Sequence, residues 1–162
     1  MLAPMTPLLV VIQGLAIASS VLQQLIAMRV GIFGSGDAST LGQSLTLVSF
    51  AAIYGWWPAA MYASTTSARG GLLALLLLNV LWTTLGHGLA SLFFCPPSCA
   101  AMPPLGDIGN FAAIITGIVA SVATWRAFRA ATGPIQWMFP VTAIVLIVLS
   151  FTLSAMSSVQ TM

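Results

Sequence analysis

The single histidine of the chain, His87, is the residue whose type and surroundings best suit a chemical role. It stands between Gly86 and Gly88 inside a long apolar segment, where an ionisable side chain is a functional candidate by default. The two glycines leave space for a flat macrocycle, so His87 is a candidate ligand of a haem or chlorophyll-type pigment. A six-coordinate haem would need a second axial ligand from a methionine or a partner chain. We favour the alternative, a neutral imidazole hydrogen-bonded to a neighbouring helix, and the sequence requires no cofactor.

Cys95 and Cys99 form the second candidate pair, in a loop that also contains Pro96 and Pro97. Because proline prevents a helix here, the backbone can bring the two sulfur atoms within bonding distance. We predict a structural disulfide, with two unpaired thiols as the main alternative. Redox dithiols usually have the spacing C-x₂-C rather than C-x₃-C. Two thiolates also fall short of the four ligands of a usual tetrahedral metal site, so we expect no metal.

Other catalytic side chains are scarce. The chain has no lysine or glutamate, and its formal charges come only from Arg29, Arg69, Arg126, Arg129, Asp37 and Asp107. It contains no carboxylate pair for acid–base catalysis, no HExxH or GxSxG motif and no phosphate-binding glycine loop. We therefore expect a protein that is not an enzyme. A net charge of +2 is also too small for nucleic-acid binding, which needs clustered basic residues.

The composition indicates a membrane protein. Of the 162 residues, 59% are hydrophobic and 4% are charged, and the mean hydropathy is +1.07. A soluble domain carries about 25% charged residues. Such a chain has too little polar surface for water, so we expect the lipid bilayer to be its solvent.

Five apolar segments position these residues, and each has the roughly 20 residues that a membrane-spanning helix needs. They are residues 7–28, 41–63, 71–94, 106–130 and 134–157. Glycine, proline and serine residues separate them. We predict one domain, an all-α integral membrane protein that forms a compact bundle of five transmembrane helices, with a kink near Pro140.

The arginines predict the orientation of this bundle. With five spans, Arg69, Arg126 and Arg129 lie on the same side as the N-terminus, and Arg29 lies on the other side. Basic residues accumulate on the cytoplasmic side of membrane proteins. We therefore expect a multi-pass protein of the inner membrane with a cytoplasmic N-terminus, and with the C-terminus and the cysteine loop outside.

Polar residues follow one face of two predicted helices. The first row contains Gln13, Ser20 and Gln24, and the second contains Asn79, Thr83 and His87. Their spacings of four and seven residues place each row on a single helix face. In lipid such residues usually join helices by hydrogen bonds, so we interpret both rows as contacts between helices.

The fourth segment has a small residue at every fourth position. The row consists of Gly109, Ala113, Gly117 and Ser121. Small side chains let two helix backbones approach closely, which provides much of the packing in lipid. The row predicts a tight helix contact, either within this chain or with another membrane subunit.

Parts of the third, fourth and fifth segments resemble the TspO family of membrane proteins. Leu78-Asn79-Val80-Leu81-Trp82 is similar to that family's Asn-x-x-Trp in the third helix. Trp125 and the pair Phe139-Pro140 are similar to parts of its fourth and fifth helices. The resemblance covers about a quarter of the chain, and it implies a five-helix fold that binds tetrapyrroles and sterol-like ligands.

Three functional hypotheses follow. The first, which we prefer, is a non-catalytic accessory subunit that binds other integral membrane subunits, for example in a respiratory or photosynthetic complex. The second is a TspO-like binding protein or carrier for a lipophilic or tetrapyrrole ligand. The third, a small transporter or channel, is the weakest because the only acidic residue in a predicted span, Asp107, stands at a helix N-terminus, and the chain has no inverted repeat.

Overall fold

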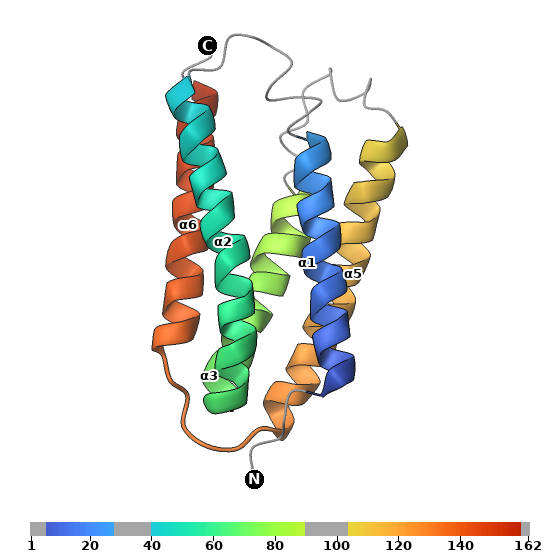
Figure 1. The fold of residues 1–162 in the computed structure, drawn as a ribbon, viewed down its shortest axis with the longest axis vertical. Helices are drawn as coiled ribbons and strands as arrows, with labels where there is room; N and C mark the ends of the chain where they lie inside the picture. The colour runs from blue at the N-terminus through green and yellow to red at the C-terminus, as the bar shows by residue number, and fades with distance from the viewer. Residues whose placement is uncertain (1–5, 28–39, 90–103, 160–162) are drawn as a thin grey trace.

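The structure, a computed structural model, describes residues 6–27, 40–89 and 104–159. Its helices are α1 (Pro7–Ala27), α2 (Thr40–Thr66), α3 (Ala68–Leu77), η2 (Leu78–Leu89), α5 (Pro104–Ala130) and α6 (Met138–Val159). Because η2 continues α3 without a break, the described residues form five helices and no strand (Figure 1). The prediction of an all-helical chain with five helices is confirmed for this part of the sequence.

Two boundaries differ from the prediction. The last helix begins at Met138 rather than near residue 134, so Pro140 falls in its first turn. The amide groups of a first turn have no partner within the helix, and a proline there breaks no hydrogen bond. The expected reason for a kink is therefore missing. At the other boundary, α2 and α3 are separated by Ser67 alone, where we expected a loop of several residues.

The short turn between α2 and α3 depends on Gly71. A Cβ atom at this position would lie 2.6 Å from the backbone carbonyl carbon of Ala63 and equally close to Cα of Ser64. Contacts below 3.0 Å do not occur for real Cβ atoms, so a side chain here would push the two helices apart. The absence of a side chain at Gly71 lets α3 return directly along α2.

The five helices run up and down in chain order, and α3–η2 lies in the middle (Figure 1). On one side α1 packs against α5, and on the other side α2 packs against α6. The central α3–η2 helix contacts α2, α5, α6 and, less extensively, α1, whereas α1 and α2 have few backbone contacts with each other. Trp57 of α2 and Gln13 of α1 connect these two helices through a hydrogen bond between their side chains.

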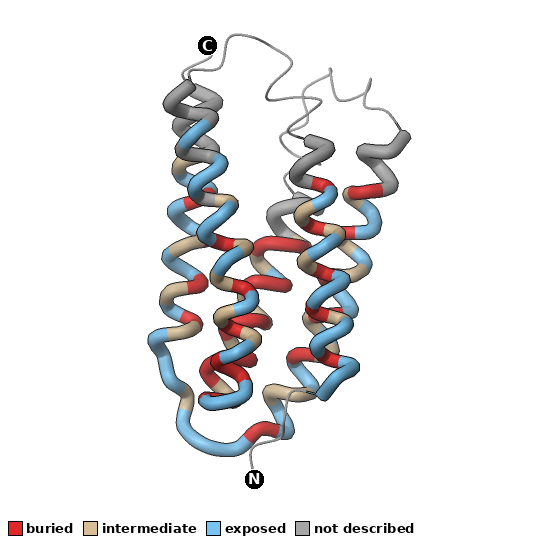
Figure 2. The backbone as a smooth tube through the Cα atoms, in the orientation of Figure 1, coloured by how far each residue is buried: buried red, intermediate tan, exposed pale blue. Residues whose placement is uncertain are grey.

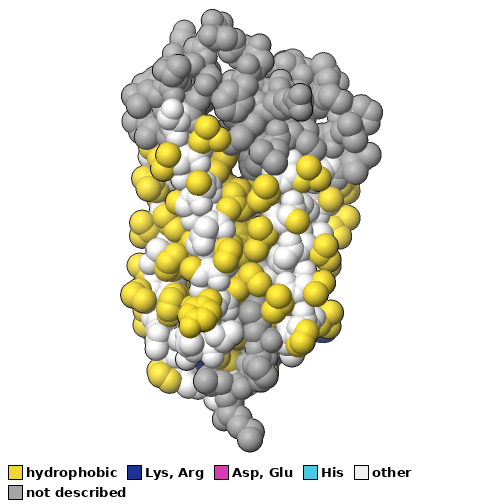
Figure 3. Space-filling model, viewed as in Figure 1, with side chains coloured by type: hydrophobic (Ala, Val, Ile, Leu, Met, Phe, Trp, Pro, Cys, Tyr) yellow, Lys and Arg dark blue, Asp and Glu magenta, His cyan; other side chains and the backbone are white. Residues whose placement is uncertain are grey.

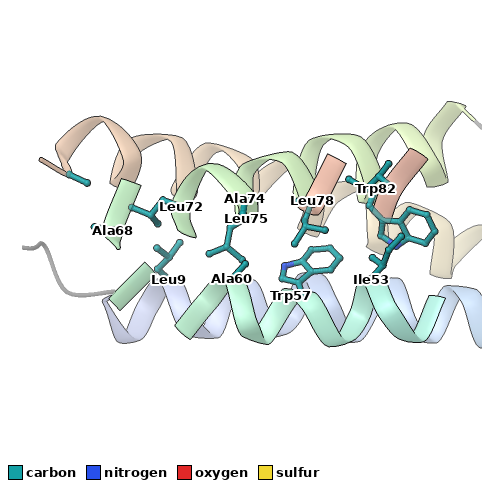
Figure 4. Close-up of a cluster of buried hydrophobic side chains, with 13 residues drawn as sticks. Leu9, Ile53, Trp57, Ala60, Ala68, Leu72, Ala74, Leu75, Leu78 and Trp82 are labelled. Carbon is teal, nitrogen blue, oxygen red and sulfur yellow. The ribbon is translucent and has the colours of Figure 1, made fainter. Parts of the chain in front are cut away.

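The buried core lies along α2 and the central helix. Figure 4 shows Trp57, Ala60, Leu75, Leu78 and Trp82 among its closely packed side chains. Buried residues recur on the inward faces of the helices, while the outward faces are exposed (Figure 2). The helices therefore share a single buried core.

η2 is a π-helix, which the sequence did not predict. In this geometry each amide N–H bonds to the carbonyl five residues earlier, so the turn is wider than in an α-helix. Within η2, the hydroxyl of Thr83 donates to the carbonyl of Asn79 and that of Thr84 donates to the carbonyl of Val80. These are the carbonyls that α-helical amide groups would bind.

One helical segment of the described residues, Gly109–Ala130 in α5, is long and apolar enough by itself to cross a membrane. Three shorter apolar stretches lie at Pro7–Gln23, Ala68–Thr84 and Met138–Leu153. Length and composition thus provide one candidate span, rather than the five that we expected.

Candidate functional site

Gln13 is the centre of a buried polar cluster in which four helices meet. Its Nε2 donates a hydrogen bond to Oγ1 of Thr124 at 2.7 Å. Its Oε1 accepts hydrogen bonds from Nε1 of Trp57 and from Nδ2 of Asn79, both at 3.1 Å. All four side chains are 0% exposed. These residues, which we call the Gln13 cluster, connect α1, α2, η2 and α5.

A second set of polar contacts surrounds the hydroxyl of Tyr54. This hydroxyl lies 2.8 Å from Oγ of Ser20 and accepts a hydrogen bond from Nε1 of Trp82 at 3.2 Å. The ring of Tyr54 stacks on that of Trp57 with centroids 6.2 Å apart. Trp82 in turn makes edge contacts with Phe50 at 5.5 Å and with Phe151 at 5.9 Å. An aromatic wall from α2, η2 and α6 therefore lies beside the Gln13 cluster.

One acceptor of the Gln13 cluster has no donor. Oδ1 of Asn79 is buried and makes no hydrogen bond, although the amide nitrogen of the same side chain is bound to Gln13. Exchanging the oxygen and nitrogen of either amide would remove the observed bonds, so the assignment is fixed by the network. A buried polar atom without a partner costs about 1–3 kcal/mol. Within the described residues, Oδ1 of Asn79 is therefore a buried acceptor of this cluster without a partner.

The chemistry of the cluster is that of hydrogen bonding. Amides, indoles and aliphatic hydroxyls supply its donors and acceptors, and these groups stay neutral near pH 7. Within the described residues, no group of three or more His, Cys, Asp or Glu side chains could hold a metal ion. The arrangement can join helices and can hold the donor group of a ligand.

Most residues of the two predicted polar rows are buried in the structure. Gln13 and Ser20 from α1 are buried, and so are Asn79 and Thr83 from η2. The side chain of Gln24 lies outside the described residues. His87 belongs to η2, but its side chain is likewise outside the described residues, so its proposed role as a pigment or haem ligand stays a prediction.

Cys95 and Cys99 lie in the range 90–103, outside the described residues. The disulfide between them stays a prediction.

The predicted row of small residues lies mainly inside the bundle. Gly109, Ala113 and Gly117 are buried, and Ser121 is half-buried. A Cβ atom at Gly117 would lie 2.7 Å from Cβ of Thr83, so α5 and η2 touch closely at this point. Oγ of Ser121 donates to the carbonyl of Gly117 within the same helix at 2.7 Å. At Gly117 the contact is therefore within the chain rather than with another subunit.

Sequence reasoning missed two members of the site, namely Tyr54 and Thr124, and it did not predict the hydrogen bond from Trp57 to Gln13. A lone hydroxyl or indole in an apolar helix follows no polar row, so no local pattern selects it. For Thr124 a weaker signal existed, because it lies seven residues after Gly117 and thus on the same helix face.

No known protein family, curated protein or solved structure matches this chain. The resemblance to the TspO family therefore has the motif residues as its only basis. Of these residues, Asn79 and Trp82 are buried and belong to the polar contacts described above. Trp125 is 46% exposed in α5, and Pro140 is buried at the start of α6.

Proposed function

We propose that this chain is an integral membrane protein whose five helices cross the bilayer, and that it serves as a non-catalytic subunit of a larger membrane complex. The observation that carries the proposal is the distribution of polarity. Gln13, Asn79, Thr83 and Thr124 are 0% exposed, whereas long apolar side chains cover the outward faces. This arrangement is the reverse of a water-soluble bundle.

Three helices illustrate the apolar exterior. Large exposed hydrophobic residues include Leu8, Val11, Leu15 and Leu22 on α1, Phe111, Ile115, Ile118 and Val122 on α5, and Val141, Val145, Val148 and Leu149 on α6. Hydrophobic side chains are spread over the face shown in Figure 3. Soluble monomers rarely expose contiguous apolar patches above a few hundred Å². Lipid tails are the natural cover for such a surface.

The lengths of the helices support several crossings. α1 has 21 residues and α6 has 22, close to the roughly 20 that span a bilayer, and α2 has 27. The central α3–η2 helix contacts all four of the other helices, so it would cross the bilayer together with them.

The outward face of α2 supports the role of a subunit. Ala51, Ala52 and Gly55 are exposed there, and a Cβ atom at Gly55 would meet no atom within 4 Å. The small row of α5 makes its close contact inside the bundle at Gly117, whereas no described helix lies against these small residues of α2. In lipid, small residues favour close approach of another helix, here one from a partner subunit.

Two measurements test this function. Washing membranes with alkaline carbonate should leave the chain in the membrane fraction, and mild detergent should release it in an assembly much larger than 16.8 kDa. Gly55→Leu should reduce that assembly while the chain itself stays folded. Val145→Leu, at an exposed position of α6, is the matched control. Release by carbonate, or a monomer in mild detergent, would contradict the proposal.

A second candidate function is the binding of a lipophilic molecule that carries a hydrogen-bond donor. The unpartnered Oδ1 of Asn79, beside the aromatic wall, favours it. Mass spectrometry of an organic extract of the purified protein would detect such a molecule, and Asn79→Leu should abolish its retention. For a pigment or haem, a visible absorption band should also disappear in His87→Phe. An extract without a retained compound would exclude this function.

A further inference from the structure

Three of the four arginines of the chain lie at one end of the bundle. Arg69 is in the first turn of α3, and Arg126 and Arg129 are near the end of α5. α3 begins and α5 ends at the lower end of the molecule in Figure 1, where the connection to α6 also lies. We call this end the arginine end.

Arg69 is already engaged with the protein. Its Nη1 donates to the carbonyl oxygen of Gly133 at 3.3 Å, and its guanidinium carbon lies 5.0 Å from the centre of the Phe128 ring. The residue is half-buried and holds the connection between α5 and α6 against α3.

Arg126 and Arg129 are exposed, and no described carboxylate pairs with either. The chain has only two acidic residues, Asp37 and Asp107. Asp107 lies in the same helix nineteen residues before Arg126, which is about 28 Å at 1.5 Å per residue. Asp37 precedes α2, whose first turn is at the opposite end from the arginine end. An anion from outside the chain can therefore bind Arg126 and Arg129.

An apolar row on α5 leads directly to these two arginines. Phe111, Ile115, Ile118 and Val122 are 68%, 55%, 50% and 48% exposed, and their spacings of four, three and four residues continue to Arg126 and Arg129. One outward face is thus apolar for most of its length and cationic at its end. This is the profile of a helix that meets lipid tails first and headgroups next.

Two exposed tryptophans lie at the arginine end as well. Trp125 is 46% exposed and stacks on Phe128 at 5.9 Å, and Trp137 is 63% exposed in the connection to α6. Tryptophan is enriched at the headgroup level of membranes. The positive charge of a guanidinium group at this level attracts the headgroups of anionic lipids.

From these observations we propose that Arg126 and Arg129 bind the phosphate groups of anionic phospholipids, so that the arginine end selects these lipids from its leaflet. The proposal rests on the membrane location proposed above and adds the lipid class. It also gives the two arginines a binding partner, beyond their effect on orientation.

The test uses purified full-length chain equilibrated with equal amounts of phosphatidylglycerol and phosphatidylcholine, followed by mass spectrometry of the retained lipids. One basic residue near an anionic surface contributes about fivefold in affinity at moderate salt. Wild type should therefore retain at least five times more phosphatidylglycerol than phosphatidylcholine. The double variant Arg126→Gln with Arg129→Gln should retain the two lipids nearly equally. Arg126→Lys with Arg129→Lys should keep most of the preference, and thermal unfolding should show that both variants are folded.

Equal retention by wild type, an unchanged preference in the glutamine variant, or loss of preference in the lysine variant would overturn the proposal. Its failure can be distinguished from failure of the proposed function. Equal lipid retention by a chain that resists carbonate contradicts lipid selection alone, whereas a chain that carbonate releases contradicts the membrane location.

Discussion

Gln13 shows how a single side chain can hold several helices in an apolar bundle. Its amide nitrogen donates a hydrogen bond to α5, and its amide oxygen accepts hydrogen bonds from α2 and η2. Water does not compete for these groups, because the residue is 0% exposed. A glutamine has one acceptor atom with two lone pairs, and here both are used. The contact is therefore specific for glutamine at this position.

We predict that Gln13→Leu destabilises the bundle more than any exposed polar substitution does. An interhelical hydrogen bond in a membrane contributes roughly 0.6–2 kcal/mol, and Gln13 makes three, so the loss should be about 2–6 kcal/mol. Thermal unfolding in detergent measures the effect. Thr152→Val is the control, because that hydroxyl is exposed and bonds only within its own helix. Equal unfolding temperatures for both variants would show that the cluster is not a stabilising contact.

The sequence predicts the polar faces but not their partners. Gln13 and Asn79 were recognised because regular spacing places each on a row with other polar residues. Their contact with Thr124 and Trp57 could not be recognised, since Gln13 and Thr124 are 111 residues apart. Pairing over such a distance depends on the packing of whole helices, and no local pattern of one sequence contains it.

At the level of helices, the close approach of η2 and α5 depends on Gly117. We predict that Gly117→Leu destabilises the bundle by about 1–3 kcal/mol through overpacking against Thr83. Ala112→Leu is the matched control, because Ala112 is exposed on the same helix. Ala123 is less suitable as a control, since it packs against the core. Similar unfolding midpoints for the two leucine variants would contradict the close contact.

Two glycines of the second and third helices provide a paired prediction. Gly71→Ala should destabilise the bundle by about 1–3 kcal/mol, because its Cβ atom would overlap the backbone of α2. Gly55→Ala should instead stabilise it by about 0.4–1 kcal/mol, since the space is open and alanine reduces the freedom of the unfolded chain. Chemical denaturation of both variants measures the change in the free energy of unfolding, which should be a loss for Gly71→Ala and a gain for Gly55→Ala. A gain in stability for Gly71→Ala would disprove the tight turn.

The helices themselves were largely predictable, because glycine and proline residues mark their ends. α5 ends at Ala130 as expected, just before Thr132-Gly133-Pro134. The errors have local physical reasons. Seven residues separate the second and third predicted helices, yet Gly71 allows a turn with Ser67 alone. The π-helical form of η2 was not predicted, because hydropathy does not distinguish it from an α-helix.

For the whole molecule, the direction of each helix relates the charges to the proposed membrane. The central helix has Arg69 in its first turn at the arginine end and runs toward the opposite end as far as Leu89 (Figure 1). Cys95 and Cys99 follow in the chain. If the arginine end is cytoplasmic, as the positive-inside rule predicts, the segment with the two cysteines emerges outside the cell. An outside location is also oxidising, which would allow the predicted disulfide.

We therefore predict that a membrane-impermeant thiol reagent labels Cys95 and Cys99 in intact cells only after reduction. Before reduction the disulfide leaves no thiol, and after reduction both thiols face the reagent. A control places a cysteine at the arginine end, as Thr132→Cys in a chain with Cys95→Ser and Cys99→Ser. Thr132 is exposed, so this cysteine should react only after the membrane is permeabilised. Labelling of the native cysteines without reductant would contradict the disulfide, and labelling of Thr132→Cys in intact cells would reverse the orientation.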